Sequence, residues 1–169
     1  MAAEGNIKLK QEDTGIRQLG DACIVIVKTE WNHAIADELE RGCRKVLLQY
    51  GVEKIITHTV PGSVEIPFAV SAAWEHCNDN NRPDAFITFG CVIRGGTPHF
   101  DYVCRMVADG VLQLNLQLDV PVIFGVLTVD NEAQAQERTG GAHGHKGEEA
   151  ALTALKMIAL NRRLQAGMP

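Results

Sequence analysis

The chain has 169 residues, of which 46% are hydrophobic and 22% are charged. These are ordinary values for a globular protein of this length, so they argue against a disordered chain and predict a single domain over residues 1–169. The formal net charge of -5 at pH 7 argues against a nucleic-acid partner, because a surface that neutralises phosphates would normally carry a basic excess.

Cysteine usage and the N-terminus bear on where the protein works. The 5 cysteines are odd in number, lack C-x-x-C spacing and mostly lie in apolar runs, so we expect free thiols in the core. Residues 1–17 read as a polar, flexible N-terminal arm with no apolar signal region, and no stretch is long and apolar enough to span a membrane. A cytoplasmic protein is the expectation, unless a targeting segment has been removed.

The first predicted strand and helix follow the arm. Residues 22–27 form a short apolar run rich in β-branched side chains, which is typical of a buried strand. Asn32 can cap the following helix, in which apolar residues recur at helical spacing, and Gly51 ends it.

The same alternation continues to the C-terminus. Further strands are predicted over residues 52–59, 84–93 and 121–128. Helices are predicted over 66–77 and 98–118, then a short one near 131–138, a loop of glycines and histidines, and a long helix over 146–164.

Strands that alternate with helices through short connections predict a parallel sheet covered on both faces, because each right-handed crossover returns its helix to the sheet. The expected fold is therefore α/β, a three-layer α/β/α sandwich of the flavodoxin-like kind with a four-stranded parallel sheet. An N-terminal strand from or to a neighbouring subunit is a candidate extension of this sheet. In such folds ligands bind beyond the carboxyl ends of the strands.

Every predicted strand ends in residues that suit ligand binding. Trp31 and Asn32 follow the first strand, and residues 61–65, 94–99 and 128–131 follow the others. Each signal alone is more typical of packing or of a simple turn. Because the four loops converge on one edge of the sheet, together they predict a site with an aromatic ring, a carboxylate, a glycine-rich turn and a histidine.

The loop after the third strand predicts an anion site. Gly95, Gly96 and Thr97 precede a helix start, where backbone N–H groups and the helix dipole can hold a phosphate, and a tight turn without a ligand is the alternative. His99 lies in the first turn of that helix, where a titrating group can serve acid–base chemistry beside the phosphate.

Cations are concentrated in residues 138–146 of an otherwise acidic chain, which favours an anionic ligand. Metal binding through His143 and His145 is one alternative, and a mobile solvated loop is another. No third cysteine or histidine ligand lies nearby in the sequence, so we expect no metal site.

From Ala22 onward the chain resembles the lumazine synthase family over nearly its whole length. The matching pieces, in family order, are Trp31-Asn32, PGSVEIP at 61–67, GCVIRGGTPHFDYV at 90–103, PVIFGVLT at 121–128, and ERTG at 137–140 with Lys146-Gly147. Five pieces in the family's order make the resemblance specific.

The resemblance implies a flavodoxin-like domain that assembles as a homopentamer, sometimes stacked into larger shells, and uses no cofactor. It implies a transferase of riboflavin biosynthesis that condenses 5-amino-6-(D-ribitylamino)uracil with 3,4-dihydroxy-2-butanone 4-phosphate to 6,7-dimethyl-8-ribityllumazine, releasing phosphate and water. One alternative is a riboflavin synthase of the same fold, which has no use for the phosphate site of Gly96, Thr97 and Arg138. The other is a non-catalytic flavin-binding shell protein, which would be expected to lack His99 or Arg138.

The resemblance also implies roles for individual residues. His99 matches the acid–base histidine, and Gly96, Thr97 and Arg138 match the phosphate site. Positions that bind the aminouracil and its ribityl chain are matched by Trp31, Asn32, Ser63, Val64, Glu65, Cys91, Val92, Ile93, Phe124 and Lys146. Phe124, Arg138 and Lys146 match groups supplied by the adjacent subunit, so the active sites are expected at subunit interfaces. The Trp31 ring further suggests that riboflavin binds here as a stacked ligand.

Overall fold

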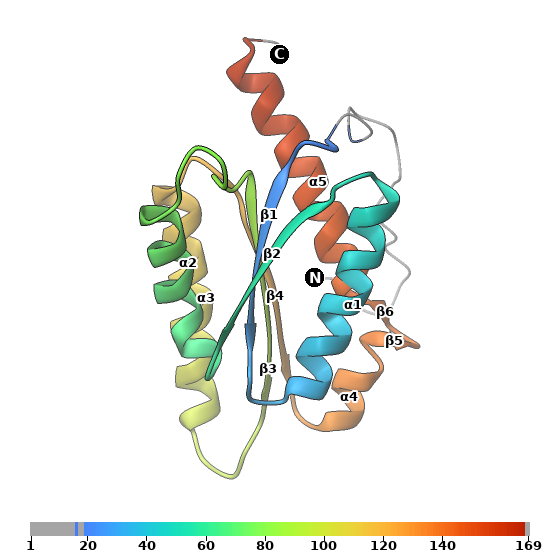
Figure 1. Ribbon diagram of the computed structural model, residues 1–169. Coiled ribbons are helices and arrows are strands. Elements are labelled where there is room, and N and C mark those ends of the chain that lie inside the picture. The colour runs from blue at the N-terminus through green and yellow to red at the C-terminus, as the bar shows by residue number, and fades with distance from the viewer. Residues whose placement is uncertain (1–15, 17–18, 168–169) are drawn as a thin grey trace.

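The computed structural model describes residue 16 and residues 19–167 and contains a four-stranded parallel sheet between two layers of helices (Figure 1). The strands are β1 (Cys23–Thr29), β2 (Lys54–Val60), β3 (Ala85–Ile93) and β4 (Val122–Val129). Their order is β2-β1-β3-β4, and every neighbouring pair is parallel. This arrangement confirms the predicted three-layer, flavodoxin-like fold.

Figure 1 shows which helices cover each face of the sheet. One face carries α2 (Ile66–Glu75) and α3 (His99–Gln117), and the other carries α1 (His33–Gln49) and α5 (Lys146–Gln165). The remaining elements are the 3-10 turn η2 (Ser63–Glu65), the short helix α4 (Glu132–Gln136) and an antiparallel hairpin of β5 (Thr139–Gly141) and β6 (Gly144–His145).

Alternation along the central strand β1 divides the core into two clusters. Ile24 and Ile26 point into the cluster beneath α1 and α5, whereas Val25 and Val27 point into the cluster beneath α2 and α3. Because helices cover both faces, the strand is apolar at all of these positions, which explains the continuous apolar run in the sequence.

The first helix begins where it was predicted to begin but by a different means. Asn32 occupies the N-cap position of α1 with a left-handed backbone (φ 55), and its side chain makes no capping hydrogen bond. Its amide Nδ2 instead donates to the carbonyl oxygen of Cys91 at 2.7 Å. Asn32 therefore stands at the predicted position, but the expected capping hydrogen bond from its side chain is absent, because the side chain bonds to β3 instead. Gly51 follows the helix with φ 82, as its predicted role at the helix end requires.

The segment predicted as a loop of glycines and histidines forms the β5–β6 hairpin. Thr139 pairs with His145, and Gly141 pairs with Gly144. Gly140 and Gly144 adopt positive φ values of 117 and 76, which glycine tolerates without strain. The strands are too short to show a two-residue periodicity, so the sequence pattern could not reveal them.

The predicted core thiols are confirmed in part. All 5 cysteines are free, and Cys23, Cys43 and Cys91 are buried, whereas Cys77 and Cys104 are partly exposed. No helix in the described residues is long and apolar enough to cross a membrane. Apart from the buried Ile16, the N-terminal arm and any strand within it lie outside the described residues.

Candidate active site

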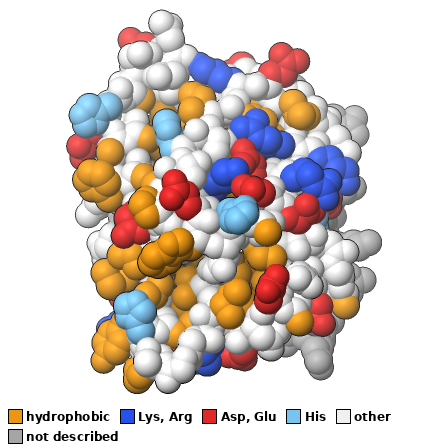
Figure 2. All heavy atoms as spheres, turned by 60° about the horizontal axis from the view of Figure 1, so that its bottom comes forward, with side chains coloured by type: hydrophobic (Ala, Val, Ile, Leu, Met, Phe, Trp, Pro, Cys, Tyr) orange, Lys and Arg blue, Asp and Glu red, His pale blue; other side chains and the backbone are white. Residues whose placement is uncertain are grey.

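The carboxyl ends of β1, β3 and β4 meet at the end of the sheet that lies lowest in Figure 1. Figure 2 brings this end forward and shows apolar, acidic, basic and histidine side chains gathered on it. The loops after the strands therefore form one rim, as the fold predicts.

Trp31 presents its indole ring at the end of β1. Its backbone N–H donates to the carbonyl oxygen of Pro61 at 3.1 Å, and its own carbonyl accepts from Thr29 Oγ1 at 2.9 Å. A Cβ on Gly62 would lie 3.2 Å from the ring atom Cε3, so the ring lies close against this glycine. Because the residue is 74% exposed, a face of the indole remains open for a flat ligand.

Asn32, Ser63 and Cys91 come together beside Trp31 from three different strand ends. Asn32 bonds to the Cys91 carbonyl, and a Cβ on Gly90 would lie only 2.7 Å from Ser63 Oγ, so only glycine leaves room for the buried serine. Burial raises the pKa of Cys91 to about 11, which keeps its thiol protonated and unsuited to nucleophilic attack. Cys91 can thus contribute only through its backbone and its bulk.

Glu65 ends η2 beside Gly62, the glycine that lies against the Trp31 ring. Its Oε2 would lie 3.1 Å from a Cβ on Gly62, so the carboxylate and the Trp31 ring flank one point of the backbone. Val64, Val92 and Ile93 are half-buried nearby in sequence, at η2 and at the last residues of β3. The structure therefore brings most of the predicted aminouracil residues to one part of the rim.

The predicted phosphate turn is open and leads directly into a long helix. Apart from the neighbouring residues in the chain, no atom lies within 4 Å of a Cβ built on Gly95 or Gly96, so the turn is uncovered on that side. The helix α3 begins at His99, which confirms that this histidine lies in the first turn. An uncovered glycine turn ahead of a 19-residue helix is a suitable place for an anion.

Arg94, to which the sequence analysis gave no role, fixes the start of this turn. Its Nε donates to Asp130 Oδ1 at 3.0 Å, its Nη1 lies 3.3 Å from Asp101 Oδ1, and its Cζ lies 4.1 Å from the centroid of the Phe100 ring. It therefore links the ends of β3 and β4 to the first turn of α3. An aspartate just after the neighbouring strand was the available signal, because parallel strand ends lie side by side.

Phe124 lies far from this rim in the same chain. It pairs with Thr88 and precedes the end of β4 at Val129 by five residues, or about 16 Å at ~3.3 Å per residue. It lies two residues from both Val122 and Val126 of the α2–α3 cluster, so its side chain is on the same face of the strand, where 43% of it remains exposed.

Arg138 and Lys146 lie at the base of the hairpin, on the opposite side of the sheet. Arg138 Nη1 donates to the carbonyl oxygen of Gln134 at 2.8 Å, and Lys146 Nζ lies 2.8 Å from both carboxylate oxygens of Glu149. The Lys146 N–H donates to the Arg138 carbonyl at 2.8 Å, which holds the two residues together. Within one chain the sheet therefore separates these cations from Phe124.

The two hairpin histidines face different acidic residues. His143 Nε2 lies 3.5 Å from Glu137 Oε2, and His145 Nε2 lies 3.3 Å from Glu38 Oε1. Among the described residues no group of three or more potential ligands could hold a metal ion.

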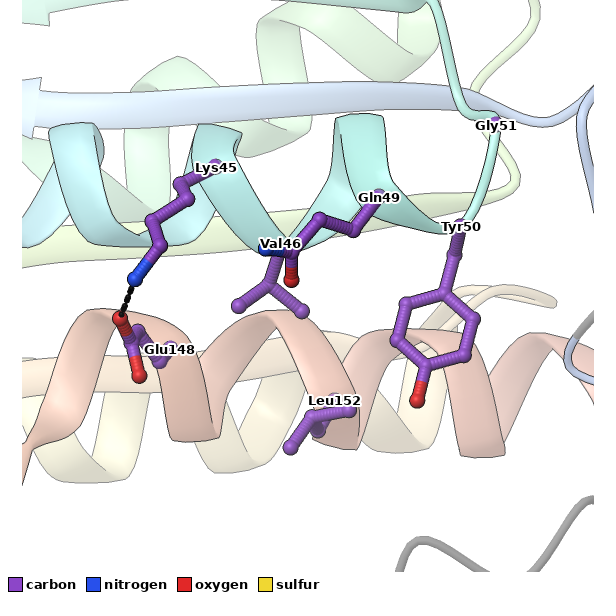
Figure 3. A pocket seen from close by; sticks show the side chains of 7 residues that line it. All are labelled: Lys45, Val46, Gln49, Tyr50, Gly51, Glu148 and Leu152. Atoms are coloured by element: carbon purple, nitrogen blue, oxygen red, sulfur yellow. Dashed lines mark hydrogen bonds and ion pairs between the residues drawn. The ribbon is translucent and has the colours of Figure 1, made fainter.

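A cavity of about 730 Å³ lies away from the rim, between α1 and α5. Its lining residues are drawn in Figure 3: Lys45, Val46, Gln49, Tyr50, Gly51, Glu148 and Leu152. The ion pair between Lys45 and Glu148, at 3.0 Å, crosses one end of it. None of the predicted site residues lines this cavity, so the candidate site is the open rim.

Comparison with known proteins gives a consistent result. The family model described as 6,7-dimethyl-8-ribityllumazine synthase matches residues 21–162. A protein of that name from Porphyromonas gingivalis is 49% identical over 144 residues, which cover 84% of this chain and 87% of that protein. The Cytophaga hutchinsonii protein of the same name is 47% identical over 85% of this chain and 89% of its own length. The Campylobacter lari protein is 41% identical over 96% and 97% of the two chains.

Proposed function

The chain belongs to the 6,7-dimethyl-8-ribityllumazine synthase family, and from that premise we propose that the rim at the carboxyl end of its sheet is one half of the active site. The protein is a transferase of riboflavin biosynthesis. It condenses 5-amino-6-(D-ribitylamino)uracil with 3,4-dihydroxy-2-butanone 4-phosphate to 6,7-dimethyl-8-ribityllumazine, with release of phosphate and water. The family match does not favour a riboflavin synthase or a non-catalytic shell protein. The whole chain, residues 1–169, would serve as one domain.

The aminouracil would bind between the loops after β1, β2 and β3. Its ring would stack on Trp31, while Asn32, Ser63 and Glu65 would hold the ribityl chain. The exposed indole and the close approach of these polar groups support this assignment. Val64, Cys91, Val92 and Ile93 would contact the heterocycle through backbone and apolar surface.

The keto-phosphate would bind at the start of α3. Its phosphate would accept hydrogen bonds from the amides of Gly96 and Thr97, aided by the helix dipole, and would pair with Arg138. The open space on the Cβ side of Gly95 and Gly96 supports this, because a ligand can approach the turn from there.

Arg138, Lys146 and Phe124 would come from the adjacent subunit. One observation supports this for Phe124, which is about 16 Å from the rim of its own chain. A site shared between subunits requires an oligomer, and we propose the homopentamer of the family resemblance. One chain alone would lack part of the ring pocket and of the phosphate site.

His99 would act as the acid–base group. The 5-amino group of the uracil attacks the ketone and, with loss of water, gives an imine; phosphate then leaves, and the ribitylamino nitrogen closes the ring with loss of a second water. Each step moves a proton, and His99 follows Thr97 of the phosphate turn by two residues in the sequence. Because Asp101 is paired with Arg94, its role would be to hold the turn rather than to transfer protons.

One observation carries this proposal: loops from separate strand ends converge around an exposed indole, beside an open glycine turn that leads into α3. The direct test mixes the protein with both substrates and follows lumazine fluorescence together with released phosphate. His99→Ala should lower kcat toward the low end of the ~10²–10⁴-fold range for acid–base catalysis, because positioning supplies much of the acceleration. His33→Ala, which changes an exposed histidine at the start of α1, is the matched control. Wild-type turnover of the His99 variant would remove it from the mechanism.

Arg138→Ala tests the phosphate site separately. Loss of a hydrogen bond to a charged group should weaken keto-phosphate binding by roughly 1.5–3 kcal/mol and leave the aminouracil KM nearly unchanged. Arg105→Ala is the control, because its side chain is 82% exposed on α3. An unchanged keto-phosphate KM in the Arg138 variant would contradict the assignment.

We further propose that riboflavin binds on the Trp31 ring and that the protein works in the cytoplasm without a metal or organic cofactor. Stacking on an indole that is 74% exposed should quench its fluorescence. A titration that gives equal quenching in the wild type and in Trp31→Phe would show that Trp74 is the reporter and would refute binding at Trp31.

A further inference from the structure

His145 is the last residue of the β5–β6 hairpin and directly precedes α5. Its side chain is only 12% exposed, although it lies on a short surface hairpin. Neither the resemblance nor the comparisons assign it a role. Its surroundings explain why it is buried.

The imidazole of His145 occupies space that a glycine of α1 leaves free. A Cβ built on Gly42 would lie 2.1 Å from His145 Cε1, and its three nearest atoms would all belong to this ring. Glycine inside a helix is less favourable than alanine, so a glycine in the middle of α1 needs a packing reason. The ring of His145 supplies that reason.

A carboxylate on the same helix holds the ring in place. His145 Nε2 lies 3.3 Å from Glu38 Oε1. The Glu38 pKa is lowered first by its hydrogen bond from Arg41 and further by the one from His145, while partial burial opposes the shift. Glu38 is therefore an ionised acceptor toward which the Nε2–H of His145 points, and His145 Nδ1 is buried without a partner among the described atoms.

The rest of the hairpin is held to the residues just before it, by Thr139 Oγ1, which donates to the Gln136 carbonyl at 3.0 Å, and by the contact of His143 Nε2 with Glu137 Oε2 at 3.5 Å. Its strands are 3 and 2 residues long, and hairpins of this size are not stable alone. Gly140 and Gly144 have positive φ values, so glycines rather than bulky side chains form its bends. Two backbone bonds, from His143 N–H to the Glu137 carbonyl and from the backbone N–H of Lys146 to the Arg138 carbonyl, tie the hairpin to the segment that carries Arg138, whose Nη1 itself donates to the Gln134 carbonyl at 2.8 Å.

We propose that His145 is a positioning residue for Arg138: the ring, seated on Gly42 and bonded to Glu38, anchors the hairpin to α1 and thereby holds the guanidinium in place for the keto-phosphate. The inference rests on the proposed phosphate role of Arg138. It gives the buried histidine an effect on one substrate without any contact with that substrate.

The first test compares His145→Ala with His143→Ala, which changes a side chain on the same hairpin that is 44% exposed. In the full-length protein, His145→Ala should raise the keto-phosphate KM and the inhibition constant of inorganic phosphate by roughly tenfold, because a small misplacement of a binding group is costly. The KM for the aminouracil should change by less than about twofold. His145→Gln, whose amide can donate to Glu38, should recover part of the loss, and His143→Ala should resemble the wild type.

A second test fills the space that Gly42 leaves for the His145 ring and keeps the ring itself. Gly42→Ala should destabilise the protein, because the new Cβ overlaps the imidazole, whereas the same change in a His145→Ala background should raise the melting temperature. This reversal of sign is specific to the contact between the two residues. Hydrogen exchange at the Lys146 amide should accelerate in His145→Ala while the amides of β1 and β3 stay protected.

The outcomes separate the two proposals. If Arg138→Ala leaves phosphate binding unchanged, the proposed phosphate site fails. If Arg138→Ala weakens phosphate binding but His145→Ala does not, or raises both substrate KM values equally, the positioning role of His145 is wrong. If Gly42→Ala has the same sign in both backgrounds, the ring is not seated as described.

Discussion

The two helical layers differ in how much apolar surface a single chain buries. Beneath α1 and α5 the large side chains Leu39, Leu47, Leu155 and Ile158 are almost completely enclosed. The 19-residue helix α3 buries only Val107, Val111 and Leu114. The α2–α3 layer leaves five large apolar side chains exposed, at Phe68, Tyr102, Met106, Leu112 and Leu116, whereas the α1–α5 layer leaves three, at Leu48, Met157 and Leu164.

The exposed residues of α3 form a stripe. At 100° per residue, Tyr102, Met106, Leu112 and Leu116 fall within about one third of the helix circumference, opposite the buried stripe. A helix that is apolar on two faces needs partners on both, and an exposed apolar surface of this kind marks an interface. The comparison teaches that the α1–α5 layer completes more of its packing within the chain, and we call it the finished side. The α2–α3 layer, the unfinished side, carries an apolar stripe that is suited to contact another copy.

The finished side should be the less tolerant of added atoms. A Cβ on Gly147 would lie 2.0 Å from the carbonyl oxygen of Leu39, where α5 approaches the backbone of α1. Gly147→Ala should therefore destabilise the protein by about 3 kcal/mol or more, since backbone cannot move aside as a side chain can. Chemical denaturation measures this, with Gly96→Ala as a control whose Cβ meets no atom within 4 Å. Equal midpoints for the two variants would contradict close packing of the helices.

The unfinished side should respond in assembly rather than in folding. Phe68→Asp places a charge where the side chain is 78% exposed, so the isolated fold should tolerate it. If Phe68 lies in a subunit interface, association should weaken by about 2 kcal/mol or more per contact, and activity should fall with it. Sedimentation at several concentrations measures the change. Leu164→Asp, at an exposed site near the end of α5, is the control, and an unchanged mass for both variants would break the comparison.

A buried polar group should give the finished side a distinctive pH response. Glu40 has an 11% exposed side chain and accepts hydrogen bonds from Arg44 Nε and Thr57 Oγ1, both at 2.7 Å, while Lys28 Nζ lies 2.6 Å away. Burial alone would raise the Glu40 pKa, but these partners together hold it below its ordinary 4.5. The stability that they supply is complete above that ordinary value and is lost as pH falls through the lower folded pKa.

Glu40→Gln should therefore cost about 1.5 kcal/mol near neutral pH and progressively less as the pH falls below 4.5. Thermal unfolding across this range measures the difference between the two proteins. Glu53→Gln, at an exposed position, should leave the pH profile unchanged. A constant gap between wild type and Glu40→Gln at all pH values would refute the assigned direction.

The smallest effect on stability is expected for Arg94, on the rim at the carboxyl end of the sheet. Arg94→Gln breaks two largely exposed ion pairs, so the free energy of unfolding should change by only about 0–1 kcal/mol. The keto-phosphate KM should nevertheless rise about two- to fivefold, because Arg94 directly precedes the Gly95-Gly96 turn and ties it to Asp101 and Asp130. Steady-state kinetics measures the rise, and an unaltered KM would mean that the turn holds itself.

The sequence predicted the layers well because they depend on local pattern. Apolar runs predicted the buried strands, and Gly51 predicted the end of α1. Predictions failed where a distant contact decides the local structure. Asn32 looks like a helix cap until its bond to Cys91 is known, and the hairpin depends on the space that Gly42 leaves for His145.

The same distinction applies to the candidate site. The order of strands and loops brought Trp31, Ser63 and His99 to one edge, as expected from parallel topology. Arg94 was missed because its partners are separated from it in sequence, and the partition of Phe124 and Arg138 onto opposite sides of the sheet needed the register of β4.

The hydrogen bond of Asn32 to Cys91 determines how its side-chain amide is oriented beside the indole of Trp31. Because one N–H of the amide nitrogen donates to the Cys91 carbonyl, the side chain keeps its oxygen and its second N–H for a ligand. The oxygen can accept a hydrogen bond from a hydroxyl or an N–H of the ligand, and the amide orientation determines where that bond can form. An aspartate would keep an oxygen acceptor but could not donate to the Cys91 carbonyl. Asn32→Asp is nearly isosteric, yet it should therefore make the side chain at this position less well ordered and weaken the selection between ligands.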